Sequence, residues 1–506
     1  MRFSYIWLLV LLAVTSGNLA AGDSITTPLH IRVLATHDFH GNLRPVTYDW
    51  SNKRPVGGAT GLKSMLDDLE TACRCITFRI DGGDQMQGTL ESNLTQGVPV
   101  VKMFNYLELD AAAVGNHELD WGVDTLLARQ SEAKYAWLAA NVYRDDDGSR
   151  PVWAKPYTII ERDGVKVGII GYTTISTPNT QRPQTTDPYE FRSGYEGIRT
   201  ALDAVWKEKP DFVIITAHAA GECKDETGCA GEMVKLANEL PAGSVQLIVG
   251  GHAHDYTNSV VQGIPIVRAG AYGQGVAVVD LYRSTDNKVS FNTSNEVPYA
   301  DTARPDPVLD KLLASSMTEA DTVGKRQVAT VADHLSSLRD GDRRLGYLIA
   351  DAVRDSGDTD IGLQNAGGVR ADMLPGVITY SDVFRVTPFG NVVMRLAVTG
   401  RQIRQIVEQA YTDDYFSNLD IVYGTDSADK IRVDSVTFSD GSPVKDDGHY
   451  TLATNDYLVD GGDGMTILKN LPSTATGITV LDAVVKKLSA LPSPISLPVR
   501  KQAGQK

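Results

Sequence analysis

The sequence predicts an α/β protein built from two domains. Between Thr27 and about Leu281, short apolar runs typical of buried strands alternate with stretches of helical spacing. This alternation favours an α/β sandwich with a mixed sheet. The pattern weakens between 284 and 323, and a second series of helices and strands begins at Val328. A chain of 506 residues is also too long for one ordinary core, so two domains are expected.

Residues 1–22 have the features of a signal peptide. Arg2 supplies a positive start, the apolar core from Ile6 to Val14 is too short to cross a bilayer comfortably, and Leu19-Ala20-Ala21 offers small residues for cleavage. No later stretch is apolar over about 18 residues. We therefore expect a periplasmic or extracellular protein with no membrane span after signal cleavage. Its oligomeric state stays open.

The chain is acidic, with a formal net charge of −15. An acidic protein is a poor general binder of nucleic-acid polymers and of anionic membranes. An anionic substrate would therefore need a local basic site.

Four cysteines remain after export. Cys223 and Cys229 bracket a polar loop, and a disulfide between them is expected to be possible. Cys73 and Cys75 are only two residues apart, where a direct bridge is expected to be strained. For this pair, two free or buried thiols are an equal alternative.

Hydrophobic spacing places the regular elements between the motifs. It predicts helices over 61–71 and 195–207, and two strands between 157 and 172 that meet at the turn Arg162-Asp163-Gly164. A connecting helix is expected over 306–317. In the second domain the predicted elements are helices at 345–353, 400–409 and 482–491 and strands at 361–364 and 392–398.

The stretch Gly115–Asp120 carries the first group of chemically active side chains. It follows the apolar run 109–114, and Gly115 allows a sharp turn at the end of that strand. Asn116 and His117 then follow the turn, and Asp120 comes within reach of His117 if a helix begins there. The Asn116 amide oxygen can bind a metal ion. The His117 imidazole beside it can act as an acid or stabilise charge, and the Asp120 carboxylate can orient the imidazole.

Four further predicted strands end in the same kind of residue. Asp38 and His40 lie at positions i and i+2 of an extended segment, so both side chains point to one side. The other strand ends carry Asp81-Gly82-Gly83-Asp84, His218 and Gly251-His252-Ala253-His254. Five of the nine histidines lie in these motifs. Because ligands bind beyond the carboxyl ends of strands in open α/β sheets, the five motifs predict one metal site.

The C-terminal half carries a second group of motifs. Asn365–Arg370 is a glycine-rich turn that ends in arginine, which suits an anion. Thr387–Asn391 and Asn455–Gly464 each place an aromatic residue among turn residues, and the second also supplies a carboxylate. Two aromatic rings can hold a flat base, with each stack contributing roughly 1–3 kcal/mol. A carboxylate can accept hydrogen bonds from two ribose hydroxyls.

The order Asp-x-His, Gly-Asp, Gly-Asn-His-Glu, His and Gly-His-x-His resembles the calcineurin-like metallophosphoesterases. Together with the three C-terminal motifs, it resembles the secreted 5′-nucleotidase family, from about Leu29 to Leu491. The resemblance implies a four-layer α/β sandwich followed by a smaller α/β substrate-binding domain. The implied segments are the signal peptide 1–22, a dimetal phosphoesterase domain 23–300, a linker helix 301–327 and a nucleotide-binding domain 328–498.

The resemblance also assigns roles to single residues. The implied metal ligands, with Asp84 bridging two ions, are Asp38, His40, Asp84, Asn116, His218, His252 and His254. His117 and Asp120 match the catalytic pair. The implied substrate-binding residues are Arg339, Asn365, Gly368, Arg370, Phe389, Asn391, Tyr457 and Asp463. Arg339 is placed only by its spacing, because Arg343 and Arg344 lie close by. Some family members have Gln where His254 stands, and an arginine where this chain has Leu335.

These assignments predict an exported hydrolase that removes phosphate from nucleoside 5′-monophosphates, with broad nucleotide specificity left open. Two divalent ions activate water for in-line attack on phosphorus, and zinc, manganese or cobalt suits the imidazole-rich ligand set. Alternatives on the same fold are a 2′,3′-cyclic-nucleotide 2′-phosphodiesterase/3′-nucleotidase and a nucleotide-sugar pyrophosphatase. A non-catalytic nucleotide-binding protein is a distant alternative, since all seven ligands and the catalytic pair are present.

Overall fold

The computed structural model describes residues 29–181, 183–224, 228–337, 342–425 and 431–499. The predicted signal peptide, 1–22, lies outside these residues. None of the helices in the described part of the chain has both the length and the apolar composition that crossing a membrane requires.

The first sheet has the strand order β18-β17-β1-β4-β5-β6. Its strands are β1 (Leu29–Thr36), β4 (Ile76–Asp81), β5 (Ala111–Ala113), β6 (Ala136–Leu138), β17 (Val276–Arg283) and β18 (Val289–Glu296). The run β1-β4-β5-β6 is parallel, whereas β17 and β18 are antiparallel to their neighbours. The carboxyl ends of the four parallel strands therefore meet at one edge.

The second sheet has the strand order β15-β16-β14-β11-β9-β8 and is also mixed. Its strands are β8 (Tyr157–Arg162), β9 (Val165–Thr173), β11 (Phe212–His218), β14 (Leu247–Gly250), β15 (Tyr256–Val261) and β16 (Ile264–Ala269). The pair β8–β9 confirms the two strands that the sequence predicts around the turn at Asp163.

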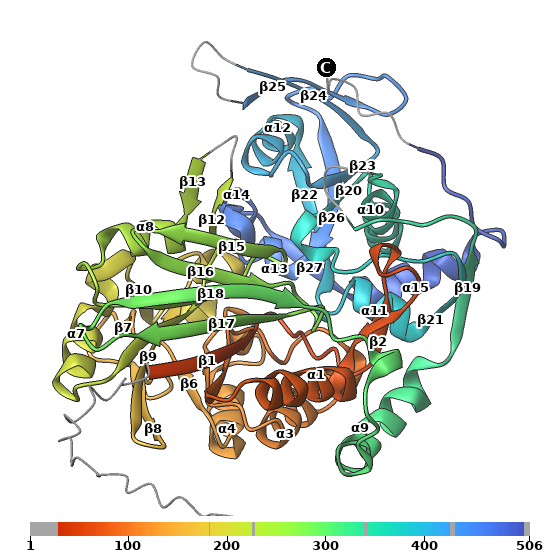
Figure 1. Ribbon diagram of the computed structural model, residues 1–506. Helices are drawn as coiled ribbons and strands as arrows, with labels where there is room; N and C mark the ends of the chain where they lie inside the picture. The colour runs from red at the N-terminus through yellow and green to blue at the C-terminus, as the bar shows by residue number, and fades with distance from the viewer. Residues whose placement is uncertain (1–28, 182, 225–227, 338–341, 426–430, 500–506) are drawn as a thin grey trace, which may run out of the picture.

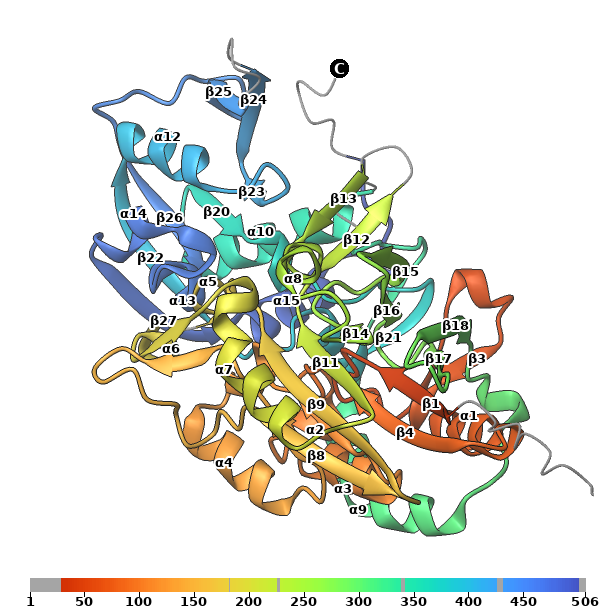
Figure 2. The ribbon, with the colours of Figure 1, turned by 60° about the vertical axis from the view of Figure 1, so that its left-hand side comes forward.

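The two sheets pack face to face through β-branched and aromatic side chains, among them Ile31 and Phe78 from the first sheet and Ile169 and Ile214 from the second. Helices cover both outer faces (Figures 1 and 2). The helices α1 (Gly58–Ala72), α3 (Val98–Tyr106) and α4 (Val123–Glu132) cover the first sheet, and α7 (Gly194–Lys207) and α8 (Glu232–Glu239) cover the second. The four-layer sandwich is confirmed.

The C-terminal domain is built on a five-stranded sheet with the order β23-β20-β26-β22-β27. The strands are β20 (Ile361–Gln364), β22 (Val392–Thr399), β23 (Tyr415–Ser417), β26 (His449–Asn455) and β27 (Ser473–Thr479). One apolar cluster packs α10 (Arg344–Gly357), α11 (Tyr380–Val386) and α15 (Val480–Ala490), and another packs α12 (Gly400–Gln409), α14 (Thr466–Lys469) and the hairpin β24 (Leu419–Thr425)–β25 (Ile431–Phe438). This arrangement confirms the smaller α/β domain.

The connecting helix α9 (Pro307–Gly324) is longer than the helix that hydrophobic spacing predicts over 306–317, and it lies within the linker helix 301–327 that the resemblance implies. The Asp306 carboxylate caps its first turn by accepting hydrogen bonds from the backbone of Val308 and Leu309. Leu309 and Leu313 are buried in the core beneath the first sheet, so α9 packs on the N-terminal domain. The chain then enters β19 (Gln327–Val331). The exact domain boundaries remain predictions.

The remaining elements are short. They are β2 (Pro45–Thr47), β3 (Pro55–Gly57), β7 (Val142–Arg144), β10 (Tyr189–Phe191), β12 (Gly221–Lys224), β13 (Gly228–Gly231), β21 (Gly376–Thr379), α2 (Leu90–Asn93), α5 (Thr177–Thr180), α6 (Pro183–Thr186), α13 (Asp456–Val459) and the 3₁₀ turns η1 (Asp49–Ser51), η2 (His117–Leu119), η3 (Ala300–Thr302), η4 (Ala366–Gly368) and η5 (Gly462–Gly464).

All four cysteines are in disulfides. Cys223 and Cys229 face each other across the hairpin β12–β13 and are bonded, which confirms the bridge considered possible. Cys73 and Cys75 are also bonded to each other, so the alternative of two thiols is wrong for this structure.

We predict that Gly171→Ala lowers the free energy of unfolding by about 2 kcal/mol, as expected for overpacking a core. A Cβ at Gly171 in β9 would overlap the backbone carbonyl of Leu138 in the other sheet, and this carbonyl has no freedom to rotate away. Gly61→Ala in α1 is the matched control, because the nearest atom to its new Cβ is 3.4 Å away. Urea denaturation followed by circular dichroism measures both. Equal midpoints for Gly171→Ala and the wild type would contradict the prediction.

Candidate active site

The five motifs at strand ends converge where the two sheets terminate. They follow β1, β4 and β5 of the first sheet and β11 and β14 of the second. Asp38, His40, Asp84, Asn116 and His218 are each 2% exposed or less. His252 and His254 complete the set at the end of β14. The structure thus brings together all seven predicted metal ligands.

Two groups of ligand atoms share Asp38. In the first, the Asp38 Oδ1 atom lies 3.2 Å from His254 Nε2 and 3.7 Å from His40 Nε2. In the second, Asp38 is joined by Asp84 and His218, whose Oδ2 and Nε2 atoms are 3.1 Å apart. Asp84 Oδ2 is also 3.9 Å from His40 Nε2, so this carboxylate contacts both groups.

Asn116 lies beside the second group. Its Oδ1 atom is 3.0 Å from His218 Nε2 and 3.1 Å from His252 Nδ1. The seven side chains therefore form one continuous cluster of oxygen and nitrogen donors.

Two of the imidazoles are oriented for metal binding because their Nδ1 atoms are already engaged by backbone carbonyls. His40 Nδ1 contacts the Gln87 carbonyl at 2.7 Å, and His218 Nδ1 contacts the Gly82 carbonyl at 2.9 Å. These contacts direct both Nε2 atoms inward, as the outer partners of metal-binding histidines do. The Oδ1 atom of Asp38 is buried and accepts no hydrogen bond among the described residues. A buried carboxylate oxygen that faces two imidazole nitrogens without a hydrogen bond fits a divalent cation.

Four of the seven predicted ligands have a strained backbone. Asp38, His40, Asp84 and His252 have φ angles of 47°, 49°, 55° and 69°. This left-handed region is unfavourable for residues with a Cβ, and such residues cluster at functional sites where the surrounding structure enforces them. The turns direct each side chain into the cluster.

The electrostatics of the cluster show a surplus of buried negative charge. Burial alone would raise the pKa of Asp38, but the neighbouring imidazoles, first that of His254, hold it well below its usual range. Burial likewise opposes ionisation of Asp84, yet His218 lowers its pKa. Burial lowers the pKa of His218, but Asp84 raises it to about 10. Burial lowers the pKa of His252 to about 4. The carboxylates of Asp38 and Asp84 thus favour the protonated form of the His218 imidazole, and this part of the cluster favours positive charge.

His117 and Asp120 form the expected pair. The His117 Nδ1 atom lies 2.9 Å from Asp120 Oδ2, and the Asp120 Oδ1 atom accepts a hydrogen bond of 2.7 Å from the Gln181 amide. The backbone N–H of His117 also donates to Asp84 Oδ1 at 2.8 Å. The pair therefore lies at the rim of the metal cluster and is oriented from both sides.

Glu118 is a residue whose role the sequence reasoning missed. Its buried carboxylate accepts hydrogen bonds from the backbone N–H groups of Asp84 (2.9 Å), Gln85 (2.8 Å) and Gly115 (2.8 Å). It thus ties together the loops after β4 and β5, which carry Asp84 and Asn116. The signal was present, because Glu118 lies inside the quoted motif.

Residues from the C-terminal domain close the site. The pocket has a volume of about 970 Å³, and its walls include metal-cluster residues and C-terminal motifs together. An Arg370 Nη atom lies 3.5 Å from the Nε2 atoms of both His40 and His254. The Phe389 ring stacks on the His117 ring, with centroids 5.5 Å apart and planes 20° from parallel.

The remaining predicted substrate residues lie on the far wall. The Asp463 Oδ1 atom is 2.8 Å from the Tyr457 hydroxyl, and its Oδ2 atom accepts a 2.9 Å hydrogen bond from Asn365. Burial, with the Asp463 carboxylate, raises the pKa of Tyr457. Gly368 and Asn391 also line the pocket.

Arg339 lies outside the described residues, and its two neighbours are engaged elsewhere. Arg343 donates to the backbone carbonyls of Asp413 and Asp414 at 2.6 and 2.8 Å. Arg344 pairs with Asp333 and with Asp342. Leu335, at the position where some family members have an arginine, is buried in the domain core.

The sequence reasoning missed two further positioning residues. Tyr272, which follows β16, places its hydroxyl 2.9 Å from His254 Nδ1. Asp414 accepts backbone hydrogen bonds from Ala366 (2.8 Å) and Tyr411 (3.0 Å) and so holds the glycine-rich turn. Tyr272 contacts a residue 18 positions away, and Asp414 holds Ala366, 48 positions away. An aromatic residue at a strand end, in Ala271-Tyr272-Gly273, was a weak signal of the role of Tyr272. Nothing in the local sequence indicates the role of Asp414.

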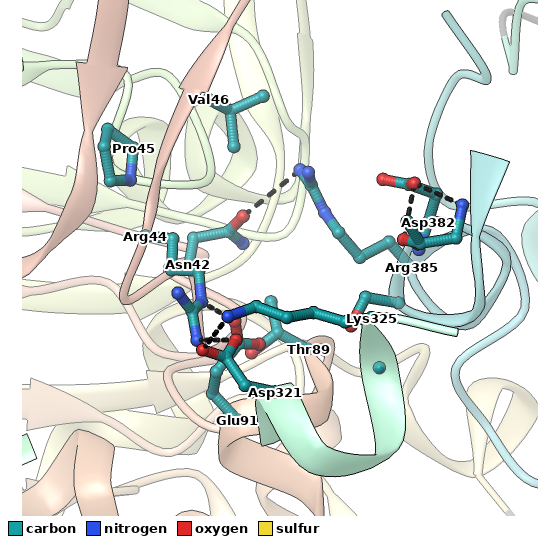
Figure 3. Close-up of a pocket in the computed structure, with 13 residues that line it drawn as sticks. Asn42, Arg44, Pro45, Val46, Thr89, Glu91, Asp321, Lys325, Asp382 and Arg385 are labelled. Carbon is teal, nitrogen blue, oxygen red and sulfur yellow. Dashed lines mark hydrogen bonds and ion pairs between the residues drawn. The ribbon is translucent and has the colours of Figure 1, made fainter. Parts of the chain in front are cut away.

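A smaller cavity of about 220 Å³ lies between the two domains (Figure 3). Arg44 and Lys325 both pair with Asp321 at 2.7 Å, which neutralises much of the positive charge there. Arg385 of α11 reaches across to the side-chain oxygen of Asn42 at 3.5 Å. Asn42 is two residues beyond His40, so this contact joins the C-terminal domain to a metal-site loop.

Comparison with known proteins follows the same division into two parts. Residues 323–470 match the family described as 5′-nucleotidase, C-terminal domain, and residues 20–278 match the family described as bacterial capsule synthesis protein PGA_cap. The chain is 26% identical to protein UshA of Escherichia coli, over 94% of this chain and 93% of that protein. It is 27% identical to a 5′-nucleotidase of Vibrio cholerae, with the same coverage of 94% and 93%.

A solved structure has the same fold. The 5′-nucleotidase precursor of Thermus thermophilus superposes with a TM-score of 0.83 at 24% identity. The match covers 94% of this chain and 99% of that one. The likeness therefore extends through both domains.

We predict that Glu118→Ala lowers the free energy of unfolding by roughly 3 kcal/mol and reduces bound divalent metal. Three buried backbone N–H groups lose their acceptor, and each unsatisfied buried donor costs about 1–3 kcal/mol. Glu132→Ala is the control, because its side chain is 44% exposed and its ion pair with Arg129 contributes little. Urea denaturation and plasma mass spectrometry of the dialysed protein measure the two effects. Wild-type stability and metal content in Glu118→Ala would show that the three hydrogen bonds are dispensable.

Proposed function

Because this chain belongs to the 5′-nucleotidase family, with a calcineurin-like N-terminal domain and a 5′-nucleotidase C-terminal domain, we propose that it is an exported hydrolase that removes phosphate from nucleoside 5′-monophosphates. The family is the one that its motifs resemble. The substrate, the bond that is cleaved and the role of each residue are our proposals.

The observation that carries the proposal is that Arg370 and Phe389 of the second domain contact the catalytic cluster of the first. A guanidinium beside the cluster is suited to a phosphate. An aromatic ring stacked on His117 is suited to the flat group attached to that phosphate. One pocket can therefore hold a phosphate and a base at the same time.

Two divalent ions would be held by the seven clustered Asp, His and Asn side chains, where they would activate water and offset negative charge on the phosphate oxygens. The many imidazoles favour zinc, manganese or cobalt over magnesium. His117 stabilises charge on the phosphate, and Asp120 orients its ring. Arg370 binds the phosphate, with Arg339 as its proposed partner.

The nucleoside is held by the far wall of the same pocket. Phe389 and Tyr457 clamp the base, and Asn391 contacts its edge. Asp463 accepts hydrogen bonds from the ribose hydroxyls. Asn365 orients Asp463. Gly368 lines the pocket with its backbone, and a Cβ at this position would overlap the Gln364 side chain. Stacking accepts any base, which favours a broad nucleotide range.

Export is supported by two features of the chain. The first 22 residues have the pattern of a signal peptide. Both cysteine pairs are bonded, which is typical of a periplasmic or extracellular compartment. Two alternative reactions fit the same pocket: cleavage of 2′,3′-cyclic or 3′-nucleotides and of nucleotide-sugar pyrophosphates.

A substrate panel tests the proposal. After chelation, we expect no phosphate release from AMP, and release on addition of manganese, zinc or cobalt. A coupled phosphate assay would compare AMP with 3′-AMP, 2′,3′-cyclic AMP, ATP and UDP-glucose, with added phosphatase to reveal ring opening. Turnover of the cyclic or 3′ substrates alone would reject the 5′ preference. No turnover with any metal would favour the non-catalytic binder.

Two substitutions separate chemistry from binding. His117→Ala should lower kcat by about 100-fold or more with retained nucleotide affinity, since the imidazole acts on the transition state. Phe389→Ala should mainly raise KM, by roughly 10-fold, because one base stack is lost. Steady-state kinetics and calorimetry with a non-hydrolysable nucleotide measure both. A kcat unchanged in His117→Ala would remove this residue from the mechanism.

A further inference from the structure

A second group of possible metal ligands lies at the opposite edge of the first sheet. One atom each of His30, Cys73, Cys75 and Asp280 lies within 4.8 Å of the others. His30 is near the start of β1, Asp280 lies on the neighbouring strand β17, and Cys75 directly precedes β4. Cys73 directly follows α1. Segments distant in the sequence thus deliver two sulfur atoms, an imidazole and a carboxylate to one point.

This group is separate from the catalytic cluster. From His30 to Thr36, β1 spans about 20 Å at 3.3 Å per residue, and Asp38 follows beyond its other end. None of the residues proposed to hold metal or nucleotide belongs to the group. The proposed function therefore gives this group no role.

The imidazole and the carboxylate are already oriented toward each other. His30 Nε2 lies 3.0 Å from Asp280 Oδ1, and the His30 ring stacks on Tyr282 with centroids 4.3 Å apart. Arg32 also binds Asp280, through Nε to Oδ1 at 2.9 Å and a terminal nitrogen to Oδ2 at 2.8 Å. A carboxylate oxygen has two lone pairs, so Oδ1 can keep the contact with Arg32 and bind a cation.

The two sulfur atoms are bonded to each other in this structure, and a disulfide is not a metal ligand. Both cysteines are partly exposed, so a reductant can reach them. A dithiol supplies two electrons and two protons: its own disulfide forms, the bond between Cys73 and Cys75 breaks, and each sulfur becomes a thiol. The exposed Arg74 between them favours the thiolate form.

We propose that reduction of the Cys73–Cys75 disulfide creates a zinc-class metal site with His30 and Asp280. Two thiolates, one imidazole and one carboxylate form a four-ligand set of the kind that zinc accepts in tetrahedral geometry. Binding releases the two thiol protons to solvent. This surface site then responds both to reductant and to the metal concentration, and it is separate from the catalytic cluster.

Cobalt tests this proposal on the mature full-length protein. Thiolate–cobalt bonds give an intense near-ultraviolet charge-transfer band, which the catalytic cluster of oxygen and nitrogen donors does not produce. After chelation, a water-soluble phosphine reduces the disulfides, takes up oxygen from water and becomes a phosphine oxide. We expect the reduced protein to bind one more equivalent of cobalt than the oxidised protein and to show the thiolate band.

Variants assign the band to its ligands. Cys223→Ser/Cys229→Ser removes the other disulfide and should keep the full band, whereas Cys73→Ser/Cys75→Ser should lose it and the extra equivalent. His30→Ala should weaken cobalt binding at least 10-fold, because even the loss of a residue that only orients a metal ligand costs about 10–100-fold in affinity. Far-ultraviolet circular dichroism checks that each variant is folded. A reduced wild type without the band, or a band that persists in Cys73→Ser/Cys75→Ser, would overturn the proposal.

Discussion

Two buried carboxylates govern the architecture of the site. Asp38 and Asp84 are almost completely buried where two sheets end, and their ionised forms are held by the imidazoles around them. Buried charges persist only when they are paired, hydrogen-bonded or bound to metal. The strained turns at Asp38, His40, Asp84 and His252 follow from this requirement, because each one directs a ligand inward that an ordinary turn would direct elsewhere.

The sandwich supplies the rigidity that such turns require. Strands from both sheets end at the site, so a loop from either sheet is held by a packed core on the side away from the cluster. Glu118 adds a fixed acceptor between the loops after β4 and β5. Strain of order 1–3 kcal/mol per residue is maintained when the surrounding structure over-determines the conformation. The large apolar area shared by the two sheets provides that support.

The second domain completes the walls of the pocket around the buried Asp and His cluster. Arg370 and Phe389 reach the N-terminal cluster, and the Tyr457 hydroxyl lies 2.7 Å from the Asn179 carbonyl at the end of α5. Gln181, two residues further, donates to Asp120. The wall that carries Tyr457 is therefore connected through α5 to the pair His117–Asp120.

The α/β class, the two domains and the meeting of five strand-end motifs could be predicted from the pattern of the amino-acid sequence, and the family resemblance proposed the seven individual metal ligands. This was possible because strand periodicity and strand-end motifs are local, and because parallel strands bring their carboxyl ends to one edge. The contacts between distant segments emerged only in the folded chain: Tyr272 beside His254, Asp414 beside the turn at Ala366, Gln181 on Asp120, and His30 and Asp280 beside Cys73 and Cys75. The bond between Cys73 and Cys75 was also left open by spacing alone. Hydrogen bonds and metal sites depend on distances in space, and these are set by how the sheets and domains pack.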